Sequence, residues 1–164
     1  MQAAIIDACA LINLIRSGGA AEILSAIPTE VWFQGLVEDE IVKDKVILEQ
    51  LLEAGLIHRF DGSSLSATAV GDIAADHEIG VGEAECVTIC VESGELLISD
   101  DRRARDVGVD LLGAENVTGF IGLLCQCIDG GAISSVQAAK WLANAQGAGG
   151  FLPDFDFDTR QMVA

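Results

Sequence analysis

The stretch that decides the fold is Leu96-Leu97-Ile98-Ser99-Asp100-Asp101-Arg102-Arg103-Ala104-Arg105. Its three apolar residues in a row are too few for a helix and predict a short buried strand. The serine and the two aspartates end that strand and can cap a following helix, because their oxygens accept hydrogen bonds from first-turn amides. In open parallel sheets, ligands bind at the carboxyl ends of the strands. The stretch therefore predicts either a helix cap or a functional site, and the rest of the chain must decide between them.

Charge is unevenly distributed along the chain. The 164 residues include 26 Asp and Glu against nine Lys and Arg, which gives a formal net charge of −17. Three of the nine cations lie in the quoted stretch, at Arg102, Arg103 and Arg105. So few cations argue against the broad basic face that most nucleic-acid-binding proteins carry. A cluster of carboxylates instead suits hard divalent cations.

Size and composition bound the class of protein. With 51% hydrophobic residues, two prolines and no low-complexity run, residues 1–164 are expected to form a single domain. The five cysteines include no C-x-x-C pair, and an odd number of thiols among apolar residues is typical of a reducing compartment. No apolar run is long enough to span a bilayer, so we expect a cytoplasmic protein without membrane association.

Apolar strands alternate with amphipathic helices along the chain. Strands are expected at residues 3–7, 30–33, 56–60, 96–99 and 115–119. Helices are expected at residues 11–15, 20–26, 36–54, 63–79, 82–93, 120–128 and 134–142, and an extended tail at 149–158 should pack back on the domain. This alternation is typical of an α/β fold, here a three-layer sandwich with a central, mostly parallel sheet.

Acidic side chains recur where strands end and helices begin. Asp7 follows the first strand, Glu40 lies beside the apolar stripe of residues 36–54, and Glu83 and Glu85 open a later helix. Each has a local explanation, because Asp is a good N-cap and the helix dipole favours acids in the first turn. Carboxyl ends of strands and starts of helices nevertheless share one edge of a right-handed parallel sheet. We therefore expect these acids to converge there with the Asp-Asp pair.

Converging carboxylates repel one another, so such a cluster either shifts its pKa values or holds a cation. Oxygen ligands without His or Cys favour Mg²⁺ or Mn²⁺. Two such ions about 3.5–4 Å apart can activate a water and stabilise the leaving oxygen in phosphodiester hydrolysis. Whether Asp100 or Asp101 would bind metal stays open, and Glu83 and Glu85 are not both expected to point inward. Asn13 is either a donor that supports the site or, more simply, a surface amide.

The ordered set of segments resembles a PIN domain, most closely the prokaryotic branch related to VapC-type toxin ribonucleases. The segments are Ile5-Ile6-Asp7, Val37-Glu38-Asp39-Glu40-Ile41, Gly82-Glu83-Ala84-Glu85, Leu97-Ile98-Ser99-Asp100-Asp101, Thr118-Gly119 and Gly150-Phe151-Leu152. No single motif is specific, but together they cover nearly the whole chain. The resemblance implies a Mg²⁺- or Mn²⁺-dependent endonuclease for single-stranded or structured RNA. It also implies a homodimer and inhibition by a small antitoxin protein.

Carried over by position, the resemblance assigns roles to individual residues. The catalytic acids would be Asp7, Glu40, Glu83 and Asp101. The metal ligands would be Asp7, Glu83, Asp100 and Asp101, supported by Ser99, Asn13 and Glu85. Ser99 matches the hydroxyl residue that usually precedes the last acid. Many relatives have Ser or Thr after the first acid, where this chain has Ala8.

The three clustered arginines are expected to hold RNA phosphates beside the metal site. The alternative is a structural role, in which these arginines pair with Asp106, Asp110 or the acidic tail. Arg105 is the first candidate for such a role, because it lies four residues after Asp101.

Three other classes of protein compete with the nuclease. A PIN-like protein that binds metal or a partner without cleaving RNA would account for Ala8 and for the charge of −17. A receiver-type signalling domain would carry paired acids after the first strand and a Lys after the last. A haloacid-type phosphatase would carry D-x-D where this chain has Asp7-Ala8-Cys9. Both are set below the nuclease.

Overall fold

The computed structural model describes residues 2–164. Its strands are β1 (Ala3–Ile6), β2 (Glu30–Phe33), β3 (His58–Arg59), β4 (Leu96–Ile98), β5 (Val117–Thr118), β6 (Phe155–Asp156) and β7 (Gln161–Met162). Its α-helices are α1 (Ala8–Arg16), α2 (Ala20–Ala26), α3 (Gly35–Glu40), α4 (Lys45–Glu53), α5 (Ala67–His77), α6 (Val81–Ser93), α7 (Arg102–Leu112), α8 (Phe120–Asp129) and α9 (Ser135–Gly147). Two 3₁₀ turns, η1 (Gly62–Ser64) and η2 (Ala114–Asn116), complete the order.

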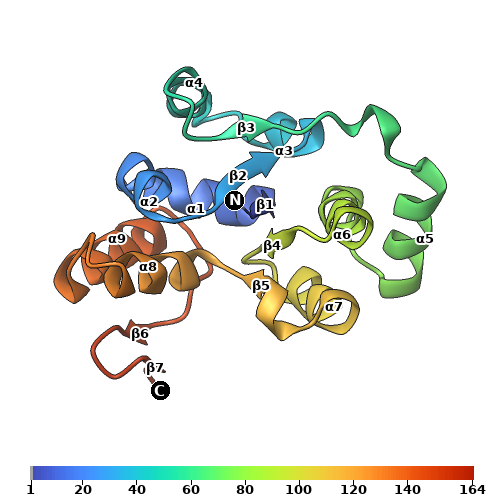
Figure 1. The fold of residues 1–164 in the computed structure, drawn as a ribbon. Helices are drawn as coiled ribbons and strands as arrows, with labels where there is room; N and C mark the ends of the chain where they lie inside the picture. The colour runs from blue at the N-terminus through green and yellow to red at the C-terminus, as the bar shows by residue number, and fades with distance from the viewer. Residues whose placement is uncertain (1) are drawn as a thin grey trace.

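Five parallel strands form the central sheet, in the order β3-β2-β1-β4-β5. Helices α1, α2, α8 and α9 cover one face of the sheet, and α6 and α7 cover the other, with α5 packed outside α6 (Figure 1). The fold is therefore the expected three-layer α/β sandwich. Strands β6 and β7 form a separate antiparallel hairpin near the C-terminus.

Strands β1 and β4, both expected from the sequence, pair directly in the sheet. Ile5 lies opposite Leu97 and Ile6 opposite Ile98, in parallel register. All four side chains are buried, as strands covered by helices on both faces require. The residues that follow each strand, Asp7 and Ser99, consequently leave the sheet at the same edge.

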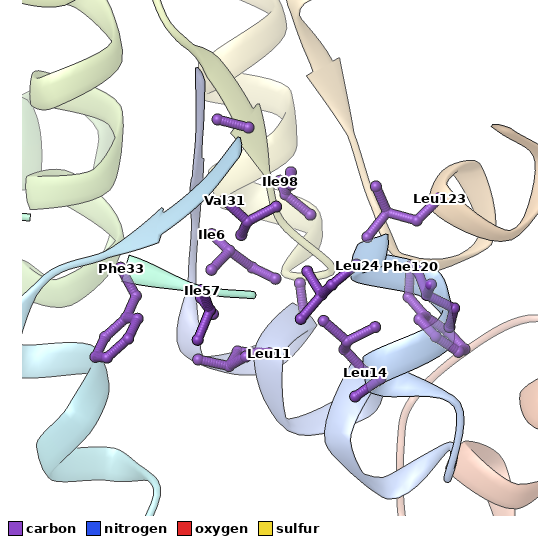
Figure 2. Close-up of a cluster of buried hydrophobic side chains, with 14 of the residues drawn as sticks. Ile6, Leu11, Leu14, Leu24, Val31, Phe33, Ile57, Ile98, Phe120 and Leu123 are labelled. Atoms are coloured by element: carbon purple, nitrogen blue, oxygen red, sulfur yellow. The ribbon is translucent and has the colours of Figure 1, made fainter. Parts of the chain in front are cut away.

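The main core lies between the sheet and the layer of α1, α2 and α8. Figure 2 shows Ile6, Val31 and Ile98 projecting from the strands toward Leu11, Leu14 and Leu24 of the first two helices and toward Phe120 and Leu123 of α8. On the opposite face α7 approaches the sheet closely, because a Cβ added at Gly108 would lie 2.6 Å from a Leu97 methyl group and 3.1 Å from a Val117 methyl group.

Several element boundaries differ from expectation. Residues 36–54 do not form one helix: α3 ends at Glu40 and α4 begins at Lys45. The break lets Ile41 bury its side chain and lets Asp44 pair with Arg16 of α1, with Arg16 Nε 2.9 Å from Asp44 Oδ2. Helix α5 begins after Ser66, whose hydroxyl accepts from the Ala69 amide at 3.2 Å, and not at residue 63.

The strands at the two edges of the sheet are shorter than predicted. Strand β3 contains two residues instead of residues 56–60, and the segment expected at 115–119 starts as η2 before β5. Edge strands are often kept short, which limits pairing with other chains. The tail packs back as expected through Phe157, which is 4% exposed. Among residues 2–164, no helix is both long and apolar enough to cross a membrane.

Candidate active site

Asp7 stands at the centre of the carboxyl edge of the sheet. It follows β1 and caps α1, with Oδ1 accepting from the Ala10 amide at 2.9 Å, and its backbone amide donates to Ile98 of β4 at 2.9 Å. Its other oxygen accepts a hydrogen bond from the Ser99 hydroxyl. The predicted helix cap and the predicted site residue are therefore the same carboxylate.

Burial dominates the electrostatics of Asp7, whose side chain is 2% exposed. Removal from water raises its pKa to about 7, because a low-dielectric environment disfavours the charged form. The hydrogen bonds from Ala10 and Ser99 lower the pKa, and the negative charges of Asp100 and Glu83 raise it further. Asp7 is thus a carboxyl group that ionises near neutral pH.

Asp100 ties two helices to the sheet edge. Its Oδ2 accepts from Asn13 Nδ2 of α1 at 2.9 Å, and its Oδ1 accepts from the Phe120 amide at the start of α8 at 2.9 Å. Burial raises its pKa, while these two hydrogen bonds and the charge of Arg105 lower it. Asn13 is 6% exposed, so it is a supporting donor and the surface-amide alternative is wrong.

Asp101 begins α7, where Oδ1 accepts from the Ala104 amide at 2.8 Å. Its backbone amide donates to the Ser99 hydroxyl oxygen at 3.2 Å. Within residues 2–164, its second carboxylate oxygen has no hydrogen-bond partner, whereas both oxygens of Asp100 have one. Of the two aspartates, Asp101 therefore keeps more capacity to bind a ligand.

Glu83 and Glu40 approach each other from different helices. A Cβ added at Gly82, in the first turn of α6, would lie 3.1 Å from Glu40 Oε1 of α3. Burial and the neighbouring charge of Glu83 raise the pKa of Glu40. The charge of Glu83 also reaches Asp7, which places the two carboxylates in the same electrostatic environment.

Glu85 faces a different space from Glu83. It lines an open cavity of about 430 Å³ together with Gln34 and Asp39, below α3. Burial raises its pKa, with no contribution from the other acids of the edge. The expectation that Glu83 and Glu85 point in different directions agrees with this arrangement.

The three arginines differ in their surroundings. Arg103 Nη2 lies 3.1 Å from Glu78 Oε2 in an exposed ion pair. Arg105 does not pair with Asp101 as its spacing suggested. Its guanidinium lies instead beside Asp100, and a Cβ added at Gly119 would lie 2.8 Å from Nη1. Arg102 is exposed and forms no ion pair with any residue from 2 to 164.

Two features near the acids were not singled out from the sequence. Cys9 is an exposed residue near Asp7, Asp101 and Glu83, and partial desolvation of its thiol together with their negative charges raises its pKa. Beside Cys9, a cavity of about 430 Å³ opens between Asp100, Asp101 and the exposed ring of Phe151. In the sequence, Gly150-Phe151-Leu152 was one of the segments that resemble a PIN domain and part of the predicted tail, but Phe151 was assigned no role in the site.

The donor set matches a hard divalent cation by chemistry, since it offers carboxylate oxygens, and the buried Asp7 gains from a neighbouring positive charge. The side chains are not drawn together into a coordination shell: in the described part of the chain, no three His, Cys, Asp or Glu residues form a group that could hold a metal ion. The chemistry of these residues therefore fits a divalent cation, but their side chains do not form a coordination geometry.

The five-stranded parallel sheet, with Asp7, Asp100 and Asp101 following its strands at the carboxyl edge, defines an α/β protein of the class in which ligands bind at that edge. A family model described as a PIN domain matches residues 3–152. The chain therefore belongs to the PIN domain family, whose members are generally nucleases and typically use divalent metals. No curated protein matches the chain.

Proposed function

We propose that this protein is a Mg²⁺- or Mn²⁺-dependent endoribonuclease of the toxin type, acting on single-stranded or structured RNA. The observation that carries the proposal is the buried Asp7 surrounded by the charges of Asp100 and Glu83 at the sheet edge. Burial, together with these charges, makes the ionised form of Asp7 unfavourable in the absence of a cation. Functional sites are where such unfavourable arrangements are retained.

Asp7, Glu83 and Asp101 would hold the metal, with Glu40 completing the set of acids. A bound Mg²⁺ or Mn²⁺ would supply a water of lowered pKa and would neutralise charge on the phosphate. In hydrolysis the water oxygen would bond to phosphorus as the bond between phosphorus and the ribose oxygen breaks, and a proton from the water would end on the leaving ribose oxygen. The hydroxyl of Ser99 fixes the orientation of Asp7, and Asp100 fixes the helices around it.

Arg102 would contact phosphates that flank the scissile bond, since it is exposed and forms no ion pair within the described chain. Arg103 would also contact a phosphate after breaking its ion pair with Glu78. That pair is exposed to solvent and contributes little to stability. Arg105 has a structural role beside Asp100 in this proposal. A homodimer, a small antitoxin partner and a cytoplasmic location belong to the same proposal, and the five free cysteines support a reducing compartment.

A second function is favoured by the incomplete metal geometry and by the net charge of −17. In this alternative the protein binds a metal ion or a partner protein and does not cleave RNA. Both functions require the same acids, so only an activity measurement separates them.

The test is cleavage of a fluorescent single-stranded RNA with Mn²⁺, with Mg²⁺ and with EDTA. We expect cleavage that depends on metal and falls at least 100-fold in Asp7→Asn and in Asp101→Asn, with Glu85→Gln as the matched control that retains activity. Cleavage in EDTA, or equal cleavage by the aspartate variants, would contradict the proposal. Absence of cleavage in wild type, with Mn²⁺ still raising the melting temperature, would support the second function.

A further inference from the structure

Phe151 is a fully exposed aromatic residue next to the acidic edge. Its ring lines the cavity of about 430 Å³ that also contains Asp100, Asp101 and Arg102. Phe151 also lines a smaller cavity of about 140 Å³ together with Asp100 and Arg105. The two cavities therefore share Phe151 and Asp100 in their walls.

The exposure of Phe151 gives nothing to folding. Burying a Phe side chain contributes stability, and the tail does this with Phe157, which is 4% exposed, and with Phe155, which packs edge-on against it at a centroid distance of 5.0 Å. Phe151 makes no comparable contribution. Its position needs another explanation.

The backbone around Phe151 is held in place by specific contacts. The Gly150 amide donates to the Ala145 carbonyl at 3.0 Å, and Gln146 Nε2 donates to the Leu152 carbonyl at 3.2 Å. At Gly150 a Cβ would overlap Asn13 Oδ1, so only glycine lets the tail pass this close to α1. The contact with Asn13 is notable because that residue donates to Asp100. The same side chain thus positions the acidic edge and the segment that carries the ring.

We propose that Phe151 is a stacking platform for a nucleobase of the RNA, next to the phosphate that is cleaved. This inference rests on the proposed function and adds a residue that selects for unpaired nucleotides. Every base has a π face, so stacking accepts any sequence but requires a base that is free of a duplex. Arg102 on the same cavity wall supplies a cation for the phosphate of the stacked nucleotide.

The test measures binding and not only activity. Single-stranded RNA carrying one 2-aminopurine is titrated in Ca²⁺, which replaces the metals that support cleavage, with wild type, Phe151→Ala, Phe151→Leu and Phe151→Trp. We expect Phe151→Ala to weaken binding about tenfold, which lies within the range for loss of one aromatic–base stack. Phe151→Leu should lose nearly as much, because it keeps apolar surface without a π face. Phe151→Trp should bind at least as tightly as wild type.

Fluorescence gives an independent result. Stacking quenches 2-aminopurine, so the bound probe should be dimmer with wild type and Phe151→Trp than with Phe151→Ala. The control is Val136→Ala, an exposed apolar residue on α9, which should change neither affinity nor quenching. An RNA with an abasic position should lose its sensitivity to Phe151→Ala.

The outcomes separate this inference from the proposed function. If wild type cleaves RNA and Phe151→Ala binds and quenches like wild type, the stacking role is overturned and the nuclease stands. If wild type neither binds nor cleaves any RNA, both are overturned. If Phe151→Ala converts a dimer to a monomer in sedimentation without altering RNA affinity, the ring contacts a second copy of the chain, and the stacking role is again overturned.

Discussion

Replacing Asp7 with Asn should stabilise the metal-free protein at neutral and alkaline pH. Asn keeps the size of the side chain and an oxygen for the Ala10 amide, but removes the buried charge. Raising the pKa of Asp7 from 3.8 to about 7 corresponds to about 4 kcal/mol of lost stability when the carboxylate is ionised. This value is an upper estimate for the stability gained by Asp7→Asn, because in the variant the Ser99 hydroxyl must reorient toward the amide.

The sign follows from the protons bound in each state. Between pH 3.8 and about 7 the folded chain keeps the Asp7 proton and the unfolded chain has released it, so this group makes stability fall as pH rises through that window. Below it both states are protonated and the penalty is absent. The advantage of Asp7→Asn should therefore be about 4 kcal/mol at pH 8 and less than half of that at pH 5.

The assay is urea unfolding of wild type and variant in EDTA at pH 8 and pH 5. Asp110→Asn, an exposed acid on α7, removes the same formal charge and should change the free energy of unfolding by no more than about 0.5 kcal/mol. The reasoning fails if Asp7→Asn is less stable than Asp110→Asn at pH 8. It also fails if the gain is equal at the two pH values. Saturating Mn²⁺ should reverse the order, because only the wild-type carboxylate binds the cation well.

Three further predictions concern neighbouring residues. Glu83→Gln should weaken Mn²⁺ binding in calorimetry at least tenfold, while Glu85→Gln leaves it unchanged; equal losses would show that the two acids share one site. Asp100→Ala should lower the free energy of unfolding by about 2–4 kcal/mol, because it leaves two donors at the sheet edge unpaired; a loss under about 1 kcal/mol would argue against its tying role. Gly108→Val should destabilise the chain by more than about 2 kcal/mol in the same assay, since its side chain would overlap Leu97, and an unchanged midpoint would be inconsistent with this packing.

The parts of the fold that depend on local pattern could be predicted from the sequence. Two apolar runs ending in acids were enough to predict that β1 and β4 are parallel strands of one sheet, because apolar strands of this kind require burial on both faces. Their direct pairing is known only from the structure. The competing interpretations of Asp7 and Asp101 as helix caps were also right. A carboxylate that caps a helix uses one of its two oxygens for the cap. Because the second oxygen does not take part in the cap, the same residue can be both a helix cap and a candidate metal ligand.

The parts that depend on distant segments could not be predicted. Asn13 is buried because Gly150, far along the chain, packs against it. Arg105 lies beside Asp100 at the point where the backbone of Gly119 packs against both side chains. Residue spacing along a helix does not predict a contact of this kind. The break between α3 and α4 follows from the pairing of Asp44 with α1, which competes with a helical pattern that is continuous in the sequence.

The central place of β1 in the sheet determines when the sheet can be completed during translation. Asp7 is translated 92 residues before Ser99, the residue whose hydroxyl donates a hydrogen bond to it. At about 5–20 residues per second, this separation takes about 5–20 s to translate. Throughout that interval one edge of β1 has no partner strand. Phe120, whose amide donates a hydrogen bond to Asp100, is translated later still. A nascent chain therefore cannot assemble the acidic edge of its sheet until β4 and the start of α8 have both been translated.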